Sequence, residues 1–302
     1  MHTMVTEAEH AAVTEAAYAK INIGLDVLRR RPDGYHELRM VMQTVGLHDD
    51  VILSREEKPG IRLSCDRPGL PADRRNLAYR AAEVMQERFG LGGVSIVLRK
   101  RIPAEAGLAG GSADAAAVLR GMAKLYGLDV KPETLRELGL PLGADIPYCV
   151  CGGTAVAEGI GEKLTFLPDP APCTVVIMKP DFDLSTGAVY GALHIEQRNA
   201  ADHPDMDAVI AAGQAGDLIR MAEHMGNILE LPALEIHPEI AAIKAAFLRA
   251  GASGASMTGS GSAVFGIFPD LKTAERCPEL LREEFGGAAK EIYLTSPVGR
   301  VC

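Results

Sequence analysis

The sequence predicts an α+β protein of two domains, and two patterns carry this prediction. In the second half, segments of strand and helix character follow the order β-α-β-β-α-β when one extra helical stretch is set aside, which is the ferredoxin-like arrangement. In the first half, an apolar strand leads through a glycine-rich loop into a helix. With 302 residues, 47% of them hydrophobic, the chain can fill one large or two moderate cores.

The first half begins with a polar tail at residues 1–12, followed by a strand at 18–28 (YAKINIGLDVL). Because side chains alternate along a strand, Lys20 and Asn22 point to the same face. The other elements expected in this half are strands at 50–54 and 61–65 that pair with each other, a helix at 76–89 stopped by Gly90, a strand at 94–98, a helix at 115–126 and a short helix opened by Pro132.

The second half supplies the elements of the ferredoxin-like order together with the extra helical stretch. They are a strand at 174–178, a largely helical segment at 206–229, a helix at 238–250 ended by Gly251, a glycine-rich pair of strands around 257–268, a helix at 271–285 and a strand at 291–294.

The charge of the chain excludes some classes of partner. A net charge of −9 argues against a nucleic-acid surface, because binding to a polyanion requires a clustered positive face. Positive charge is local, at residues 29–31 and 99–101, where it either attracts a small polyphosphate or lies on a solvated turn. No apolar run approaches the roughly 20 residues that span a bilayer, and the N-terminus lacks the pattern of a secretory signal. We therefore expect a cytoplasmic protein with no membrane or nucleic-acid partner.

The six cysteines and eight histidines do not predict a metal site. They form neither a CxxC pair nor an HExxH motif. Cys149 and Cys151 share a face if their apolar segment is a strand, which we expect after Pro147. The cysteines are expected to be buried thiols of a reducing compartment.

The glycine-rich segment at 103–117, PAEAGLAGGSADAAA, predicts a phosphate site. Gly107, Gly110 and Gly111 allow the backbone to curl closely around a ligand, and the helix that follows offers unpaired N–H groups to an anion. The segment matches neither GxxxxGK[ST] nor GxGxxG. On its own it is therefore equally compatible with a plain turn before a helix.

Other candidate residues lie in three further segments, each with a structural alternative. Tyr35 and His36 follow the turn at 32–34 and either stack on a planar base or face water. Asp145, in LGADIP, is a turn or capping residue unless it faces the glycine loop, where it would be a base. The second glycine-rich loop, at 258–262, is either a tight hairpin or part of the site.

Three separate segments, in the right order, resemble the three motifs of the GHMP small-molecule kinases. They are AYAKIN at 17–22, PAEAGLAGGSADAAA at 103–117 and MTGSGSAVFGIF at 257–268. The resemblance covers about residues 18–294. It implies the GHMP kinase fold, with an N-terminal ATP-binding domain of the ribosomal S5 domain 2-like type at 13–165 and a ferredoxin-like C-terminal domain at 166–302. The active site would lie in the cleft between the domains.

Two further segments, RRPDGYHEL and LGADIP, resemble one group within this family. Members of that group phosphorylate the 2-hydroxyl of a cytidine-diphosphate-linked methylerythritol in the non-mevalonate isoprenoid pathway, with ATP, as its magnesium complex, for the phosphoryl donor. Homoserine and mevalonate kinases share the three loops but not the RRPDGYHEL turn. The alternatives are a GHMP kinase for a different alcohol and a nucleotide-sensing protein without catalysis, although such a sensor would not need both Lys20 and Asp145.

The resemblance also implies roles for individual residues. Asp145 would be the base and Lys20 its charge partner. The residues that hold the substrate would be Asn22, Tyr35, His36 and Thr186. Those that hold ATP would be Lys100, Pro103, Ala104, Glu105, Ala106, Gly107, Leu108, Ala109, Gly110, Gly111, Ser112 and Ala113.

Three loop residues depart from the family pattern. Glu105 stands where a small uncharged residue is usual, and a carboxylate there repels phosphate unless it turns outward. Ala109 and Ala113 stand where glycine and serine are common, so a hydroxyl contact near the phosphates is expected to be missing.

Overall fold

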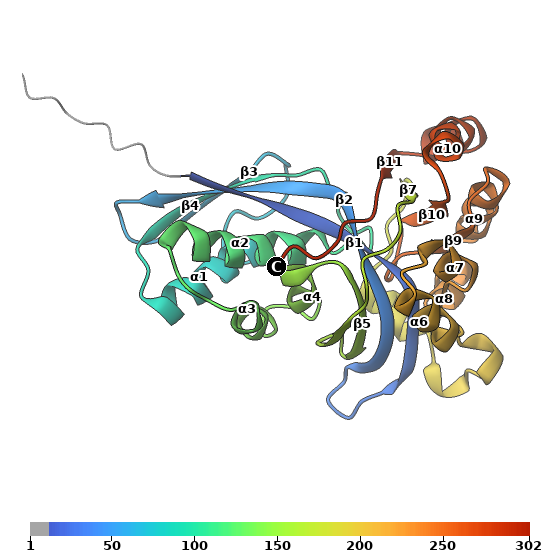
Figure 1. Cartoon of the computed structure of the whole chain (residues 1–302), viewed down its shortest axis with the longest axis horizontal. Coiled ribbons are helices and arrows are strands. Elements are labelled where there is room, and N and C mark those ends of the chain that lie inside the picture. The colour runs from blue at the N-terminus through green and yellow to red at the C-terminus, as the bar shows by residue number, and fades with distance from the viewer. Residues whose placement is uncertain (1–11) are drawn as a thin grey trace, which may run out of the picture.

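The chain folds around two β-sheets, one of seven strands and one of four (Figure 1). The structure is a computed structural model that describes residues 12–302. Apart from Ala12, the first residue of the first strand, the tail expected at 1–12 lies outside the described residues. The α+β class expected from the sequence is confirmed.

The larger sheet is organised around two long antiparallel strands, β1 and β2. Its main order is β3-β4-β2-β1-β8, while β5 pairs with the other end of β2 and β6 pairs with β5. The strands are β1 (Ala12–Arg30), β2 (His36–Glu56), β3 (Ile61–Cys65), β4 (Gly93–Arg99), β5 (Thr154–Gly159), β6 (Lys163–Phe166) and β8 (Gly226–Asn227).

The expectation that 50–54 pairs with 61–65 was wrong. β4 lies between the two segments, antiparallel to β2 and parallel to β3. A parallel pair needs a crossover rather than a short turn, and helix α1 (Leu77–Phe89) supplies it between β3 and β4. The apolar strand β4, with Ile96 and Leu98 fully buried, therefore takes the interior position.

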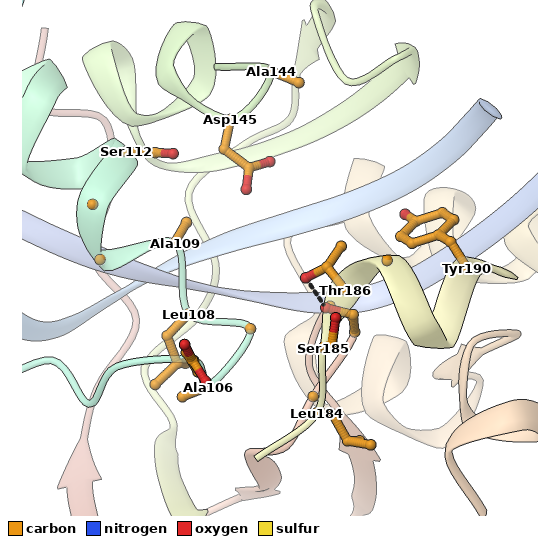
Figure 2. A pocket seen from close by; sticks show the side chains of 18 of the residues that line it. Ala106, Leu108, Ala109, Ser112, Ala144, Asp145, Leu184, Ser185, Thr186 and Tyr190 are labelled. Atoms are coloured by element: carbon orange, nitrogen blue, oxygen red, sulfur yellow. Dashed lines mark hydrogen bonds between the residues drawn. The ribbon is translucent and has the colours of Figure 1, made fainter. Parts of the chain in front are cut away.

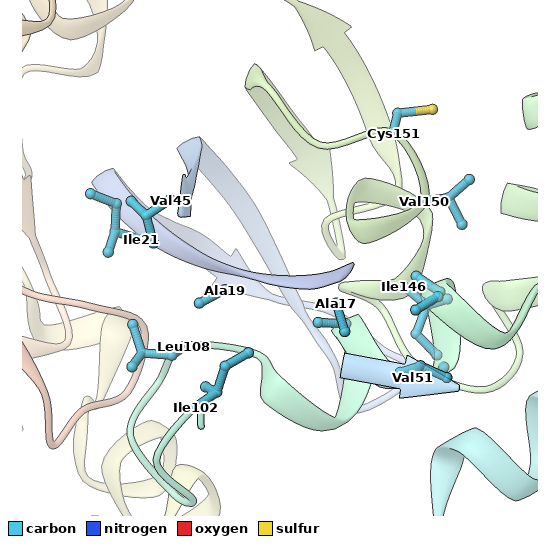
Figure 3. Close-up of a cluster of buried hydrophobic side chains, with 14 of the residues drawn as sticks. Ala17, Ala19, Ile21, Val45, Val51, Ile102, Leu108, Ile146, Val150 and Cys151 are labelled. Atoms are coloured by element: carbon cyan, nitrogen blue, oxygen red, sulfur yellow. The ribbon is translucent and has the colours of Figure 1, made fainter. Parts of the chain in front are cut away.

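Four helices lie along one face of the larger sheet (Figure 1). They are α1, α2 (Gly110–Tyr126), α3 (Pro132–Gly139) and α4 (Ile146–Cys151). The side chain of Asn76 caps α1, and Gly90 ends it in the left-handed conformation, as expected. Figure 3 shows the core beneath them, where Ala17 and Ile21 of β1 lie among side chains of the helices and of the glycine loop.

The expectation of a strand directly after Asp145 was also wrong, because residues 146–151 form helix α4. Pro147 occupies the first turn of this helix, where its missing N–H costs nothing. A short apolar run fits a buried helix as well as a buried strand, so the sequence pattern did not distinguish them. Cys149 and Cys151 consequently do not share a strand face, and Cys302, expected to be buried, is exposed.

The smaller sheet has the order β11-β7-β10-β9 with antiparallel pairs throughout, which confirms the ferredoxin-like arrangement. Along β7, Val175 and Ile177 join the core of the larger sheet, whereas Val176 and Met178 face a second core. The strands are β7 (Thr174–Lys179), β9 (Gly254–Met257), β10 (Val264–Phe268) and β11 (Glu291–Thr295).

The helices of this half pack around the smaller sheet, with α9 and α10 on its outer side in Figure 1. The α-helices are α5 (Thr186–Ala192), α6 (Met206–Gln214), α7 (Leu218–Glu223), α8 (Glu230–Ile236), α9 (Glu239–Arg249) and α10 (Leu271–Phe285). Short 3₁₀ turns occupy Ile195–Gln197, Ala200–Asp202 and Gly286–Ala288. Within residues 12–302, no helix has the length and apolar character needed to cross a bilayer.

Candidate active site

A cleft of about 1440 Å³ brings together residues from both halves of the chain. Its walls include β1, the turn before β2, the glycine loop and the start of α4 from the first half, and segments 183–196 and 259–261 from the second. In Figure 2, Asp145 and Ser112 lie across the cleft from Ser185 and Thr186. Every residue that we expect to hold ATP lines this cleft except Ala113, which is buried in α2.

The glycine loop connects β4 to α2 through backbone conformations that favour glycine. Gly107 has a φ of +71°, and a Cβ there would lie 2.0 Å from the carbonyl oxygen of Thr258, so no larger residue fits. Glu105 and Ala109 have φ values of +52° and +58° although they carry side chains. Ala109 therefore adopts the conformation that explains why glycine is common at its position. Glu105 is exposed.

Lys20 is buried in β1 and connects this strand to the glycine loop. Its Nζ donates hydrogen bonds to Asn22 Oδ1 and to the carbonyl oxygen of Gly107, both at 2.7 Å. Burial lowers the pKa of Lys20, and the nearby negative charge of Asp145 opposes this shift. The ammonium group therefore has neutral hydrogen-bond partners and one carboxylate within electrostatic reach.

Asp145 precedes the first residue of α4, and its carboxylate points into the cleft (Figure 2). Its side chain does not cap the helix, so the carboxylate oxygens are not used to satisfy backbone N–H groups of α4. Among the described residues, the hydrogen bonds of Lys20 go to Asn22 and Gly107 rather than to Asp145. The cleft can therefore admit a substrate atom beside both groups.

The second glycine-rich loop, at 258–262, contacts both other motifs. The N–H of Asn22 donates to Thr258 Oγ1 at 3.1 Å. The N–H groups of Ser262 and Ala263 donate to the carbonyl oxygens of Glu105 and Ala106, at 3.4 and 3.3 Å. The hairpin between β9 and β10 therefore also lines the cleft, through residues 259–261.

The far end of the cleft carries aromatic groups and hydroxyls. Tyr35 is 59% exposed, and the ring of His36 lies 5.0 Å from the ring of Tyr190. Burial and the positive charge of Arg30 lower the pKa of His36. Thr186 begins α5, and its hydroxyl is hydrogen-bonded to that of Ser260 at 2.8 Å (Figure 2). Tyr190, one turn after Thr186, was not singled out from the sequence, where no motif marks it.

The basic cluster at 99–101 is largely paired within the fold. Lys100 Nζ contacts Asp49 and Asp114, and all three side chains are buried. Both carboxylates raise the pKa of Lys100 against the effect of burial. The pKa of Asp114 is raised to about 7 by burial and by the negative charge of Asp49. Arg101 pairs with Asp50 at 2.6 Å, so the cluster offers less free positive charge than its sequence suggests.

The described residues do not form a metal cage. No group of three or more histidine, cysteine, aspartate or glutamate side chains between residues 12 and 302 is placed to hold a metal ion. Magnesium, however, commonly uses only one or two protein ligands together with phosphate oxygens and water. The site therefore fits a metal that enters with a nucleotide and does not fit a resident ion held by protein alone.

Comparison with known proteins agrees with this architecture. Residues 76–153 match the model of the GHMP kinases N terminal domain, and residues 207–287 match that of the GHMP kinases C terminal. The chain belongs to the GHMP kinase family. This kinase is 46% identical over 280 residues to the 4-diphosphocytidyl-2-C-methyl-D-erythritol kinase of Lachnospira eligens, covering 92% of this chain and 96% of the relative. It is 42% identical to the Bacillus subtilis protein of the same name, covering 95% and 97%.

Solved structures of this GHMP kinase's relatives share its fold. A crystal structure of 4-(cytidine 5'-diphospho)-2C-methyl-D-erythritol kinase superposes with a TM-score of 0.79 at 35% identity, covering 95% of this chain and all of that one. Homoserine kinase from Cytophaga hutchinsonii gives a TM-score of 0.80 at 20% identity, which shows the fold alone, over 97% of this chain and 96% of that one. Membership of the family implies that ATP is the phosphoryl donor, and confirms that the chain is a kinase.

Proposed function

We propose that this GHMP kinase transfers the γ-phosphoryl group of ATP to the 2-hydroxyl of 4-diphosphocytidyl-2-C-methyl-D-erythritol, a step of the non-mevalonate isoprenoid pathway. The observation that carries the proposal is the convergence of Lys20, Asp145 and the glycine loop on one cleft whose far end holds Tyr35 and His36. The names of the relatives described above point to the same substrate.

In this proposal Asp145 is the general base. An alcohol is a poor nucleophile near neutral pH, so a carboxylate within hydrogen-bond reach must accept its proton as the bond to phosphorus forms. The Asp145 carboxylate points into the cleft and has no helix-capping role that would occupy its oxygens. It is therefore available to a hydroxyl that lies between it and the glycine loop.

Lys20 is the charge partner of Asp145. A positive charge near a carboxylate favours its ionised form and stabilises phosphate oxygens that gain charge during transfer. The two hydrogen bonds of Lys20 to Asn22 and Gly107 fix its ammonium group at the junction of β1 and the loop. Both bonds go to neutral acceptors, so the Asp145 carboxylate is the charged group that acts on the ammonium group.

The glycine loop and the first turn of α2 hold the ATP phosphates. Backbone N–H groups and the positive end of the helix dipole favour an anion at this position. Magnesium would be held by phosphate oxygens, with the Ser112 hydroxyl, which points toward Asp145 in Figure 2, as a protein ligand. When bound, the metal neutralises phosphate charge, while the loop keeps the γ-phosphoryl group in line with the acceptor.

The aromatic end of the cleft would receive the cytidine group. Tyr35, His36 and Tyr190 present rings that can stack on a planar base, and His36 can also hydrogen-bond to it. The Thr186 hydroxyl and the Asn22 amide also line the cleft and would contact the sugar and diphosphate. The cleft is thus divided into a base-binding end and a phosphoryl-transfer end.

A side-by-side transfer assay tests the proposed substrate. The purified protein is given ATP and magnesium with 4-diphosphocytidyl-2-C-methyl-D-erythritol, homoserine or mevalonate, and the phosphorylated product is measured in each case. We expect kcat/KM for the cytidine-linked alcohol to exceed the other two by at least roughly 10³-fold, because the other alcohols leave the base-binding end empty. Equal or faster transfer to homoserine or mevalonate would refute the assignment.

A further inference from the structure

A five-residue segment that belongs to none of the three motifs lies directly beside the strand that carries Lys20. Residues 226–230 (GNILE) comprise β8 and the first residue of α8. β8 pairs in parallel with β1, with Leu25 opposite Asn227, and the N–H of Ile228 donates to the carbonyl oxygen of Leu25 at 3.0 Å. The sequence predicts a largely helical segment at 206–229, whereas residues 226–227 form a strand.

Asn227 holds the second glycine-rich loop through both of its amide hydrogens. The side chain is buried, and Nδ2 donates to the carbonyl oxygens of Met257 and Gly259, each at 2.8 Å. Its Oδ1 accepts the N–H of Leu229 at 3.0 Å. Because each polar atom of the amide has a partner, Asn227 can hold its orientation and that of the loop.

Glu230 holds the backbone at Met257, the residue that leads into the same loop. One carboxylate oxygen accepts the N–H of Met257 at 2.7 Å and the hydroxyl of Ser256 at 2.9 Å. The other oxygen accepts from Lys244. Glu230 therefore holds the N–H of Met257, and Asn227 holds its carbonyl oxygen. These contacts fix the backbone on both sides of Met257, the residue before Thr258.

Gly259, in the part of the loop that Asn227 holds, lies against the ammonium group of Lys20. Gly259 has a φ of +57°, and a Cβ there would lie 3.2 Å from Lys20 Nζ and 3.1 Å from the carbonyl oxygen of Gly107. Thr258 Oγ1 accepts the N–H of Asn22 and can donate to the Gly107 carbonyl at 3.3 Å. A displaced loop would therefore alter the contacts of Lys20 with both Asn22 and Gly107.

We propose that Asn227 and Glu230 are positioning residues that set the backbone of Met257–Gly259 against Lys20 and so place its ammonium group for phosphoryl transfer. They touch neither ATP nor the alcohol in this role, and act through the loop. The inference rests on the proposed function of Lys20. It adds residues 226–230 to the segments from which the sequence predicted the site.

Kinetics of Asn227→Ala test the role directly. We expect kcat to fall roughly 10- to 100-fold, because small misplacements of reacting groups cost about this much, while KM for ATP and for the alcohol each change less than about twofold. The matched control is Gln86→Ala, which removes another amide that donates to two backbone carbonyls, Gly60 and Gly92, outside the cleft. The control should keep its kcat. A folded Asn227→Ala protein with normal kcat overturns the proposal.

A double-mutant cycle with Lys20→Met identifies the route of the effect. If Asn227 acts through Lys20, adding Asn227→Ala to Lys20→Met lowers kcat by less than about threefold, because the group to be positioned is already gone. If the two losses multiply fully, Asn227 does not act through Lys20 and the inference fails. If Lys20→Met alone retains full activity, the proposed role of Lys20 fails instead, so the two failures are distinguishable.

Glu230 provides an independent pair of variants in case Asn227→Ala does not fold. Glu230→Gln keeps an oxygen for the N–H of Met257 but loses the charge pair with Lys244, so we expect lower thermal stability with kcat within about threefold of normal. Glu230→Ala removes both the acceptor for the N–H of Met257 and the charge pair with Lys244, and it should lower kcat roughly 10-fold or more. If the two variants lose kcat equally, the loss follows the charge pair with Lys244 and not the bond to the N–H of Met257, and the positioning role of Glu230 is wrong.

Discussion

Two buried lysine side chains contact the glycine loop or the helix that follows it, and the charges around them differ. Lys20 donates to an amide oxygen and a backbone carbonyl, both neutral, and burial lowers its pKa. Lys100 contacts two carboxylates, Asp49 and Asp114, which raise its pKa. A buried ammonium hydrogen-bonded to carboxylates is neutralised within the fold, whereas Lys20 donates only to neutral groups and has the Asp145 carboxylate within electrostatic reach. The comparison supports the proposed catalytic role of Lys20 and favours a structural role for Lys100.

The largest effect is expected at Asp145, the carboxylate whose charge acts on Lys20. Asp145→Asn should lower kcat by roughly 10³-fold or more, because a general base contributes about 10²–10⁴-fold and the amide cannot accept the proton. ATP affinity, measured by fluorescence titration with a labelled nucleotide, should remain within about threefold, since the glycine loop is untouched. A variant with full turnover would exclude Asp145 as the base.

Lys20→Met should produce the next largest loss of turnover with a moderate loss of stability. We expect kcat to fall roughly 10²–10³-fold, as for removal of other groups that stabilise developing charge. The free energy of unfolding in urea should fall by about 1–3 kcal/mol, because Asn22 Oδ1 and the carbonyl oxygen of Gly107 each lose a hydrogen-bond donor. An unchanged kcat would contradict the distinction drawn between the two lysines.

Lys100→Met should lower the free energy of unfolding more, and kcat less, than Lys20→Met. It leaves Asp49 and Asp114 facing each other without a cation, and breaking a buried ionic group typically costs about 3–5 kcal/mol. We therefore expect a large fall in the free energy of unfolding at pH 7, with a smaller loss of kcat than for Lys20→Met. The same urea titrations and assays provide the measurement. A stable Lys100→Met protein that lost turnover completely would reverse the two assignments.

The smallest effect concerns the pH dependence of stability around Lys100. Burial and Asp49 raise the pKa of Asp114 from 3.8 to about 7, and its Oδ1 has no hydrogen-bond partner among residues 12–302. The folded state therefore binds more protons than the unfolded state between these pH values, so this carboxyl contributes a fall in stability as pH rises from about 4 to 7. Asp114→Asn should flatten that slope in urea titrations at several pH values. An unchanged slope would show that Asp114 titrates normally.

Several elements were correctly predicted because the residues that determine them are close together in the sequence. Asn76 and Gly90 delimit α1 through a side-chain cap and a left-handed residue, and β7 alternates between two cores with the period of a strand. The glycine loop, Lys20 and Asp145 were found from motifs, and the structure brings them to one cleft. Their proposed roles are a matter for the experiments above.

Other features could be decided only by the tertiary structure, because they depend on partners far away in the chain. β4 separates β2 from β3, with Ile96 and Leu98 buried in the interior of the sheet. Residues 146–151 form a helix although their apolar residues suit a strand equally well. The sequence by itself determined which side chains are present and how each short segment can fold. Only the folded chain decided that Lys100 contacts Asp49 and that Asn227 is hydrogen-bonded to the loop beside Lys20. These contacts join residues that are 51 and 32 positions apart, and no local sequence pattern relates residues at such distances.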